Sequence, residues 1–244
     1  MKNTFIFVVL LFISSNIMFS QNGHAVYGIK YADYVKMNYN FNKANSDINK
    51  MARSLLKGLN KENESIQFDL FFNKKESIFQ LQNKLNIDNE NSTTIAVSNS
   101  KGVFYNNSKE RLRQVNSYGS TFIVKYNVIN EDNWNLLSEN RKIGKYNCFK
   151  ALNSYNIDGE TFEVEAWYTP EIPLKYGPKG FYNLPGLIIE LTITNRTKIT
   201  YFLKTIQIKS SKVKIKKPKK GKKISKKEYD EIGKKLMMKM RNEN

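Results

Sequence analysis

The sequence predicts a mainly β protein of the α+β class, built on one wide, curved antiparallel sheet shaped like a half-barrel. Three observations favour this fold. About ten short runs are rich in β-branched and aromatic residues, with turn signals roughly every eight to twelve residues. Neither alternating strand–helix units nor a repeat period is visible. Two amphipathic helical patterns, one after the first strand and one near the C-terminus, accompany the strands.

The expected strands cover 25–35, 65–73, 76–82, 102–105, 111–115, 121–129, 134–140, 145–153, 160–169, 187–195 and 200–209. In the strand at 160–169, Glu163, Glu165 and Trp167 alternate with apolar residues and should share one face. Turn signals separate several strands, namely Asn73, Gly144 and Asp158-Gly159. This spacing predicts a meander of antiparallel neighbours.

Two helices are expected beside the sheet. Ser46 is a suitable N-cap for a helix over 46–60, which carries apolar residues on one face. The polar, Asn-rich residues 83–99 should form a loop. Near the C-terminus, Ser225 and Glu228 match a capping box that opens an amphipathic helix extending to about residue 240. We expect this helix to pack on its own domain, with a mobile helix or a partner or membrane helix as alternatives.

The N-terminus predicts a secretory signal peptide at 1–20. Lys2 precedes an apolar stretch at 5–13, which is too short to span a bilayer. Cleavage is expected between Ser20 and Gln21. The mature protein should then be periplasmic or secreted, without a transmembrane segment. Residues 21–210 are predicted to form one antiparallel β-rich domain, and 211–244 a basic linker followed by the amphipathic helix.

The formal charge of +18 is concentrated near the C-terminus. Residues 204–244 hold sixteen Lys and Arg side chains but four Asp and Glu. A mobile, solvated linker over 212–223 is the favoured interpretation, because this run has few apolar residues to offset its ordering entropy. Weak contact with anionic surfaces is the alternative. A nucleic-acid partner is not expected for a secreted chain.

A long proline-rich segment, 170–186, lies between two strand patterns. Loops of this length are uncommon and are often functional. The alternative is a rigid structural crossover packed by Phe181, Tyr182 and Leu184. Gly186 is expected at a place where a side chain would clash or strain the backbone, whereas Lys179 is expected to be exposed.

Three motifs follow one another between residues 134 and 188. The first is Trp134, followed by Ile143, Gly144, Tyr146, Cys148, Lys150 and Ala151. The second comprises Ala-Trp-Tyr-Thr at 166–169 and Ile-Pro at 172–173. The third is the structural signature Leu184, Pro185, Gly186, Leu187 and Ile188. In this order, the three motifs resemble the GLPGLI family, which comprises secreted proteins of Bacteroidetes-type bacteria without an established activity. Asn183 replaces the family's first glycine, and Asn tolerates a positive φ better than most residues.

Several kinds of chemistry are not expected from this composition. His24 is the single histidine and Cys148 the single cysteine, so neither a common zinc site nor an intrachain disulfide can form. We expect Cys148 to be a buried thiol, with intermolecular pairing as the alternative. A general base at His24, on a flexible terminus, is improbable. Phosphate-loop and dinucleotide-binding motifs are missing from the sequence. Accordingly we assign no catalytic residue, no metal and no cofactor.

Two main functional hypotheses compete, and the sequence leans away from an enzyme. The first is a binding or accessory protein for an apolar ligand, a peptide or an envelope partner, with candidate lining residues Trp134, Trp167, Tyr168, Phe181 and Tyr182. The second is a hydrolase that uses Glu163, Glu165 or Glu190. A structural component of a surface complex is a further alternative. Two inward carboxylates with raised pKa values would favour the hydrolase, and a pocket free of carboxylates the binding protein.

Overall fold

The computed structural model describes residues 22–31, 66–82, 100–126, 133–157, 159–195, 198–209 and 211–242. The expected signal peptide at 1–20, the helix at 46–60 and the loop at 83–99 lie outside the described residues. The strands are β1 (Asn22–Tyr31), β2 (Gln67–Phe72), β3 (Glu76–Leu81), β4 (Val103–Asn107), β5 (Arg111–Ser117), β6 (Ser120–Tyr126), β7 (Asn135–Ile143), β8 (Tyr146–Ile157), β9 (Glu160–Thr169), β10 (Leu187–Thr194), β11 (Lys198–Lys209) and β12 (Lys222–Ser225). One 3₁₀ turn, η3 (Pro178–Gly180), and one helix, α4 (Lys226–Asn242), complete the described elements.

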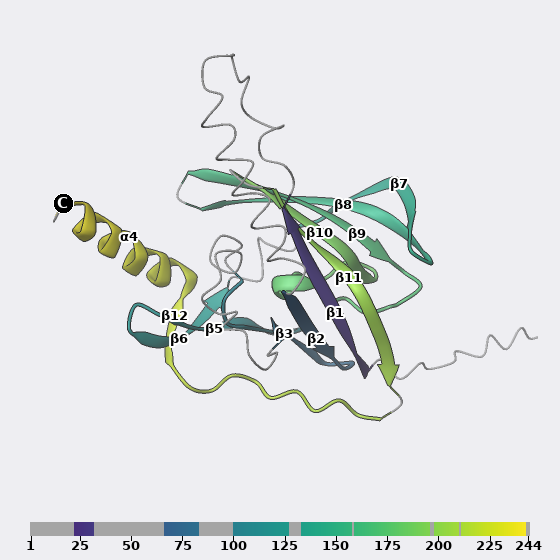
Figure 1. The fold of residues 1–244 in the computed structure, drawn as a ribbon, viewed down its shortest axis with the longest axis horizontal. Coiled ribbons are helices and arrows are strands. Elements are labelled where there is room, and N and C mark those ends of the chain that lie inside the picture. The colour runs from purple at the N-terminus through teal and green to yellow at the C-terminus, as the bar shows by residue number, and fades with distance from the viewer. Residues whose placement is uncertain are drawn as a thin grey trace, which may run out of the picture.

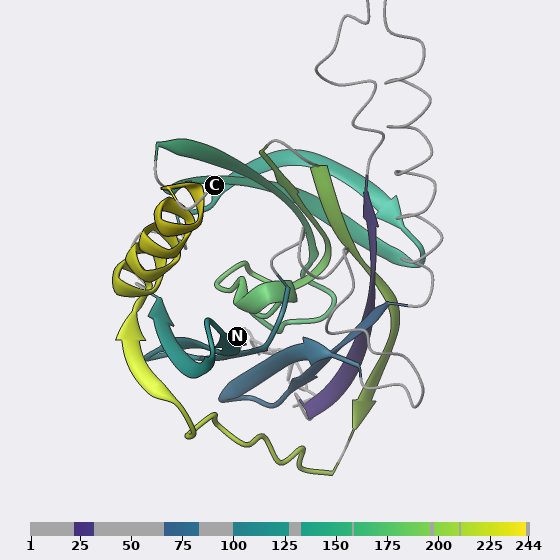
Figure 2. The same ribbon diagram turned by 60° about the vertical axis from the view of Figure 1, so that its left-hand side comes forward.

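All described strands belong to one sheet with the order β12-β6-β5-β4-β3-β2-β1-β11-β10-β9-β8-β7 (Figure 1). The sheet curls around a central space and stays open, with β12 and β7 as its edges (Figure 2). The expected antiparallel pattern holds for every pair except β12 with β6, which is parallel. The sheet is therefore mixed, because the chain returns to β6 through the extended segment 211–221 and not through a hairpin.

Pairing between β1 and β11 joins the two halves of the sheet. On one side β1 pairs with β2, and on the other it pairs with β11 over its whole length, from Asn22 opposite Lys209 to Tyr31 opposite Ile199. All these pairs are antiparallel. The first strand thus lies in the middle of the sheet, and the meanders β2–β6 and β7–β11 extend from it in opposite directions.

The turns between strands follow the local chemistry of the sequence. Between β2 and β3, the Asn73 side-chain oxygen accepts hydrogen bonds from the backbone N–H groups of Lys75 and Glu76, at 2.8 and 3.1 Å. Between β7 and β8, Gly144 has a φ of 57°. Such angles favour glycine because it lacks a Cβ atom. The two hairpins predicted at these positions are confirmed.

The main core lies on the concave side of the sheet. Phe68 stacks on Phe79 with ring centroids 5.1 Å apart, and Tyr201 contacts both rings edge-on. The segment 170–186 folds back into the same space, where η3 lies inside the curl of the sheet (Figure 2). Leu184, Leu187 and Ile188 are almost fully buried in this cluster. Apolar burial of this extent is the main stabilising contribution to such a fold.

Three details of segment 170–186 bear on the sequence predictions. Asn183 has a φ of 75°, the left-handed region that Asn tolerates. A Cβ atom built on Gly186 would lie 2.0 Å from the carbonyl oxygen of Thr169, so the expected clash is with backbone atoms. Lys179, predicted to be exposed, is instead partly buried on η3 with a φ of 54°. That expectation was wrong because the loop turns inward and not toward solvent.

The C-terminal helix begins at the predicted capping box. The backbone N–H of Glu228 donates to the Ser225 Oγ at 3.1 Å, and the backbone N–H of Ser225 donates to the Glu228 carboxylate at 2.7 Å. Tyr229 packs on Phe122 of β6 with ring centroids 5.7 Å apart. These contacts attach the first turns of α4 to the sheet. Within the described ranges, no helix is both long enough and apolar enough to cross a membrane.

Candidate functional site: the outer groove and its charged neighbours

Three of the five aromatic candidates come together around the end of segment 170–186. The Trp134 ring lies 5.9 Å from the Phe181 ring, and its indole N–H donates to the backbone carbonyl oxygen of Tyr182 at 2.9 Å. Tyr182 also contacts Tyr176, with ring centroids 5.7 Å apart. Phe181 is buried and the other two rings are partly buried. These side chains fix the path of the loop against the sheet.

The other two candidates lie on opposite faces of β9. Tyr168 faces the core beside Phe149, at 6.2 Å between ring centroids, and its burial raises the pKa of its hydroxyl group. Trp167 faces outward but is 3% exposed, because Arg141 covers its ring at 4.1 Å. The structure therefore does not bring the five aromatic candidates into one lining.

A network of ion pairs surrounds Trp167 on the outer face. Arg141 contacts Glu190 at 2.9 Å, and Lys30 contacts the same carboxylate at 3.7 Å. Lys150 contacts both Glu139 and Glu165 at 3.1 Å. The Trp167 indole N–H also donates to Glu165 at 2.9 Å. Charge-assisted hydrogen bonds of this kind favour the ionised carboxylate.

The ionisation of Glu165 follows from these contacts. Burial alone would raise its pKa, but the hydrogen bonds from Trp167 and Lys150 and the positive charge of Lys150 outweigh that effect and lower the pKa. A carboxyl group with a lowered pKa, such as that of Glu165, is poorly suited to act as a general acid near neutral pH. Glu190 lies between two cations, Arg141 and Lys30.

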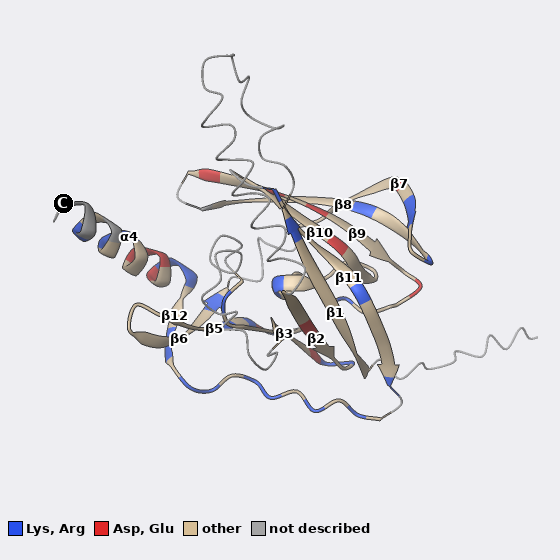
Figure 3. Cartoon of the chain, viewed as in Figure 1, with Lys and Arg blue, Asp and Glu red and all other residues tan. Residues whose placement is uncertain are grey.

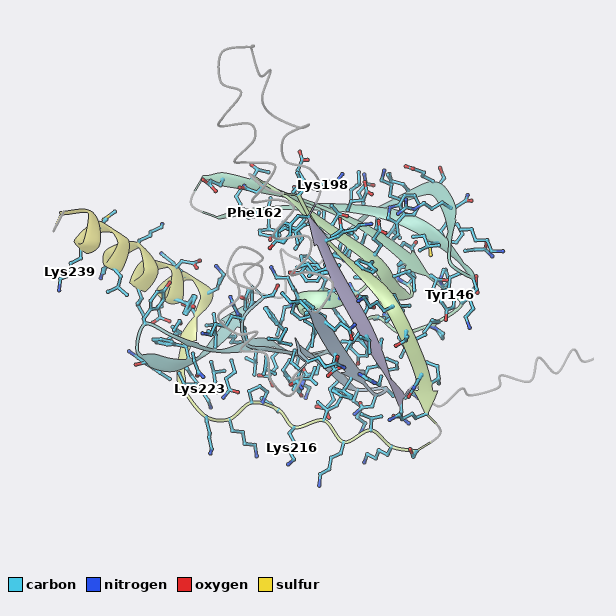
Figure 4. All side chains as sticks on the ribbon, in the orientation of Figure 1. Tyr146, Phe162, Lys198, Lys216, Lys223 and Lys239 are labelled. Atoms are coloured by element: carbon cyan, nitrogen blue, oxygen red, sulfur yellow. The ribbon has the colours of Figure 1, made fainter. Side chains whose placement is uncertain are left out.

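A groove of about 750 Å³ lies beside this network, over β8 to β11. Its lining is mostly amide, hydroxyl and carboxylate side chains, namely Asn133, Asn135, Leu152, Asn153, Ser154, Glu163, Val164, Glu165, Thr192, Thr194 and Lys198. We call this the outer groove. Figure 4 labels Lys198 and Phe162, which lie at this end of the sheet. Eight of the eleven lining residues carry an amide, hydroxyl or carboxylate group, so an elongated polar ligand can form several hydrogen bonds in the outer groove.

The two groove carboxylates are arranged side by side and not across a cleft. Glu163 and Glu165 are two residues apart on β9, and the ladder places both opposite Thr194 and Thr192 of β10. Hydrolysis by paired carboxylates needs one group on each side of the scissile bond. Glu190, the third candidate, pairs with Arg141 and does not line the groove.

His24 lies within β1, which corrects the expectation of a flexible terminus. Its Nε2 is 2.7 Å from Asp69 of β2, and its ring stacks on Phe71 at 4.4 Å. Cys148 is fully buried, and burial raises the pKa of its thiol to about 11. Among the described residues, no three His, Cys, Asp or Glu side chains form a cluster that could hold a metal ion.

A cationic cluster that was not predicted from the sequence lies inside the curl of the sheet. Arg111 and Arg113 face inward from β5 and are 4% and 3% exposed. Lys179 approaches from η3, where burial first, and then the charges of Arg113 and Lys226, lower its pKa to about 7. The signal was present, since two arginines separated by one leucine must share a strand face.

Comparisons with known proteins give limited matches. A family model described as a protein of unknown function (Porph_ging) matches residues 156–190, from the end of β8 to β10. The comparison with curated proteins finds no match. Structures of PNGF-II in C2 and P2₁ crystal forms are similar with a TM-score of 0.48 each, at 16% and 15% identity. They cover 86% and 87% of this chain, which spans 32% and 33% of theirs. These scores are too low to support an inference about fold or function.

Proposed function

We propose that this chain is a secreted or periplasmic GLPGLI-type protein that binds a polar, chain-like ligand in the outer groove without catalysing a reaction. Secretion rests on the sequence pattern at 1–20, and the family name rests on the motifs between Trp134 and Leu191. The match of residues 156–190 to a family of unknown function agrees with a chain of this kind.

The observation that carries the proposal is the composition of the outer groove. Its volume of about 750 Å³ lies within the usual range for ligand sites. Its side chains offer both donors and acceptors of hydrogen bonds along three strands, from Ser154 on β8 through Glu163 on β9 to Thr194 on β10. An elongated ligand with many hydroxyl or amide groups could bond to several of them at once. An apolar ligand would leave them unsatisfied.

The alternative, a carboxylate-dependent hydrolase, has weaker support. It requires opposed carboxylates, one with a raised pKa. Glu165 has a lowered pKa, and Glu163 lies on the same strand face. The further alternative, a structural component of a surface complex, would use the same outer face for a protein partner.

A groove-blocking variant tests the proposal. The labelled full chain is applied to arrays of soluble oligosaccharides and of extended peptides, beside the variants Ser154→Trp and Asn156→Trp. Ser154 lines the groove, whereas Asn156 is on the same strand face just outside it. We expect binding that Ser154→Trp abolishes and Asn156→Trp preserves.

Two outcomes would overturn the proposal. Binding that both variants retain would place the ligand elsewhere. Cleavage of a bound chain, detected by mass spectrometry and lost in Glu163→Gln or Glu165→Gln, would instead favour the hydrolase.

A further inference from the structure

The basic segment 211–221 lies against the outer face of the sheet as a strap, and we use that name for it below. It runs as an extended band from the end of β11 to β12 (Figure 1). The Asn73 side chain donates to the Val213 carbonyl oxygen at 3.2 Å, and the Gln114 side chain donates to the Lys220 carbonyl oxygen at 2.5 Å. Ile215 packs on an outer apolar cluster formed by Tyr105, Leu112 and Ile123. The strap is therefore attached at both ends and in the middle.

A cavity of about 510 Å³ lies between the strap and strands β5 and β6. Its lining residues are Glu110, Leu112, Ile123, Lys125, Lys217, Pro218, Lys219 and Lys223. The apolar part is well buried, since Leu112 is 6% and Ile123 3% exposed, and Pro218 of the strap is buried opposite them. This volume lies in the range of small-molecule sites. It is separate from the outer groove, which shares no lining residue with it.

Positive charge predominates around this cavity, with four lysines against one carboxylate. Lys217 forms an ion pair with Glu110, the acidic lining residue, and lies 6.0 Å over the Tyr105 ring. Lys125, Lys219 and Lys223 remain, and no described carboxylate forms an ion pair with them. Lysines also extend along the rest of the strap (Figure 3). The cavity thus combines an apolar floor with a rim of three positive charges.

We propose that the cavity under the strap binds an amphipathic carboxylate, with its apolar chain on Leu112, Ile123 and Pro218 and its anionic head among Lys125, Lys219 and Lys223. A medium-length alkyl chain matches the size of the cavity. The alkyl chain would bury its own apolar surface against Leu112, Ile123 and Pro218, and the head would meet cations that attract it from solution. A ligand with only an alkyl chain would leave the lysine rim without a counter-charge, and a ligand with only an anionic head would leave the apolar floor without a partner.

The basic charge of the strap has a second explanation, which concerns the lysines that point away from the sheet. Figure 4 shows Lys216 directed outward from the strap, and Lys214 is also exposed. A row of outward lysines could hold an anionic surface without any use of the cavity. The test must therefore separate cavity lysines from outward lysines.

Isothermal titration calorimetry of the full chain with decanoate distinguishes the cavity lysines from the outward lysines. Decanoate is kept below its critical micelle concentration. We expect decanoate to bind more tightly than decanol, which lacks the charge, and than acetate, which lacks the chain. The double variant Lys219→Ser/Lys223→Ser should weaken decanoate binding by about fivefold, as expected for the loss of two exposed ion pairs. The matched control Lys214→Ser/Lys216→Ser removes the same charge from the outward side and should change it less than about twofold.

Other results would overturn the proposal. Equal binding of decanol and decanoate would show that the lysine rim does not recognise charge. Equal weakening in both double variants would assign binding to the whole basic strap. A third result would assign the strap to an anionic surface. In that case the parent chain does not bind decanoate but binds phosphatidylglycerol vesicles, and Lys214→Ser/Lys216→Ser loses the vesicle binding. Thermal melts of each variant confirm that the fold is retained.

Discussion

The Tyr27 hydroxyl group donates a buried hydrogen bond of 2.6 Å to the backbone carbonyl oxygen of Ile188. The bond connects the central strand β1 to the start of β10, where the ladder with β9 shifts register between Ile188 and Glu190. Tyr27 is fully buried, and burial raises the pKa of its hydroxyl group, so the phenol stays protonated and able to donate. The family-like signature is thereby attached to the strand that joins the two halves of the sheet.

We predict that Tyr27→Phe lowers the free energy of unfolding by about 1–3 kcal/mol, because it leaves a buried carbonyl oxygen without this donor. Urea unfolding followed by circular dichroism measures the loss. The aromatic ring is retained in the variant, so packing changes little. A change below about 0.5 kcal/mol would mean that water or another donor replaces the hydroxyl group.

Gly186 is predicted to tolerate no side chain. In Gly186→Ala, the new Cβ would approach the Thr169 carbonyl oxygen to 2.0 Å, and backbone atoms cannot move aside as a flexible side chain would. We expect a loss of about 1–3 kcal/mol in urea melts. The control is Lys175→Ala, an exposed position in the same segment, which should cost less than about 0.5 kcal/mol. If both variants melted alike, the signature would not act through the backbone path, and a recognition role for the loop would gain support.

Strand positions could be predicted because alternation and turn residues are local signals. The observed strands at Glu76–Leu81 and Glu160–Thr169 match the expected ranges within one residue, and the shared face of Glu163, Glu165 and Trp167 follows from the period of two. The pairing of β1 with β11 could not be predicted, because it joins segments separated by most of the chain. Local patterns carry no information about such partners.

In the candidate site, too, local patterns could be predicted and contacts between distant segments could not. Strand alternation predicts that Glu165 and Trp167 share one face. It carries no information on Arg141 and Lys150, which come from β7 and β8 and cover Trp167. The five aromatic candidates were proposed to line a site for an apolar ligand, a peptide or an envelope partner, and none of them lines the outer groove. Residues 212–223 were predicted to be a mobile linker because the run has few apolar residues. In the structure, Ile215 of the strap packs on the cluster of Tyr105, Leu112 and Ile123.

Cys148 is predicted to be chemically inert in the folded protein. It is fully buried, and burial raises the pKa of its thiol to about 11, so little thiolate is present at pH 8. We expect less than about one tenth of the thiol to react with Ellman's reagent at pH 8 in native buffer, and complete reaction in denaturant. Rapid labelling of the native protein would show that β8 opens readily, or that the thiol is accessible for pairing between chains.

The depressed pKa of Lys179 predicts a pH dependence of stability. Its folded-state pKa is about 7, against 10.5 for an ordinary exposed lysine, because burial and the charges of Arg113 and Lys226 disfavour the protonated form. Between pH 7 and 10.5 the unfolded chain binds more protons at this lysine than the folded chain does, so the free energy of unfolding rises with pH. Below about pH 7 the lysine is protonated in both states, and the free energy of unfolding no longer changes with pH because of it. Lys179→Met should be more stable than the parent chain at pH 7, and the difference should shrink toward pH 10.

Melting curves at several pH values measure this effect. Lys175→Met, at the exposed position in the same segment, is the control and should follow the parent chain at every pH. A parent-like pH profile in Lys179→Met would mean that the amine escapes to solvent or is charged in the folded state.

Removal of residues 212–244 is predicted to leave a folded but less stable sheet. The deletion takes away β12 and α4, and it uncovers a small cluster formed by Val115, Phe122 and Val124, on which Ile224 and Tyr229 pack. The main core around Phe68, Phe79 and Tyr201 includes no residue of the deleted part. We expect cooperative thermal unfolding with a stability loss of about 3 kcal/mol, the value for partial exposure of a few large apolar side chains. For a domain of this size, that loss lowers Tm by roughly 6–12 °C.

A shorter deletion after Ser225 keeps the strap and β12 and removes only α4, so it should cost less than the full deletion. Differential scanning calorimetry of both truncated chains separates the two contributions. A full deletion that unfolds without cooperativity would place the strap and helix within the folding unit. A full deletion with an unchanged Tm would show that the capping box at Ser225 and the Tyr229–Phe122 contact hold the helix in place without stabilising the sheet.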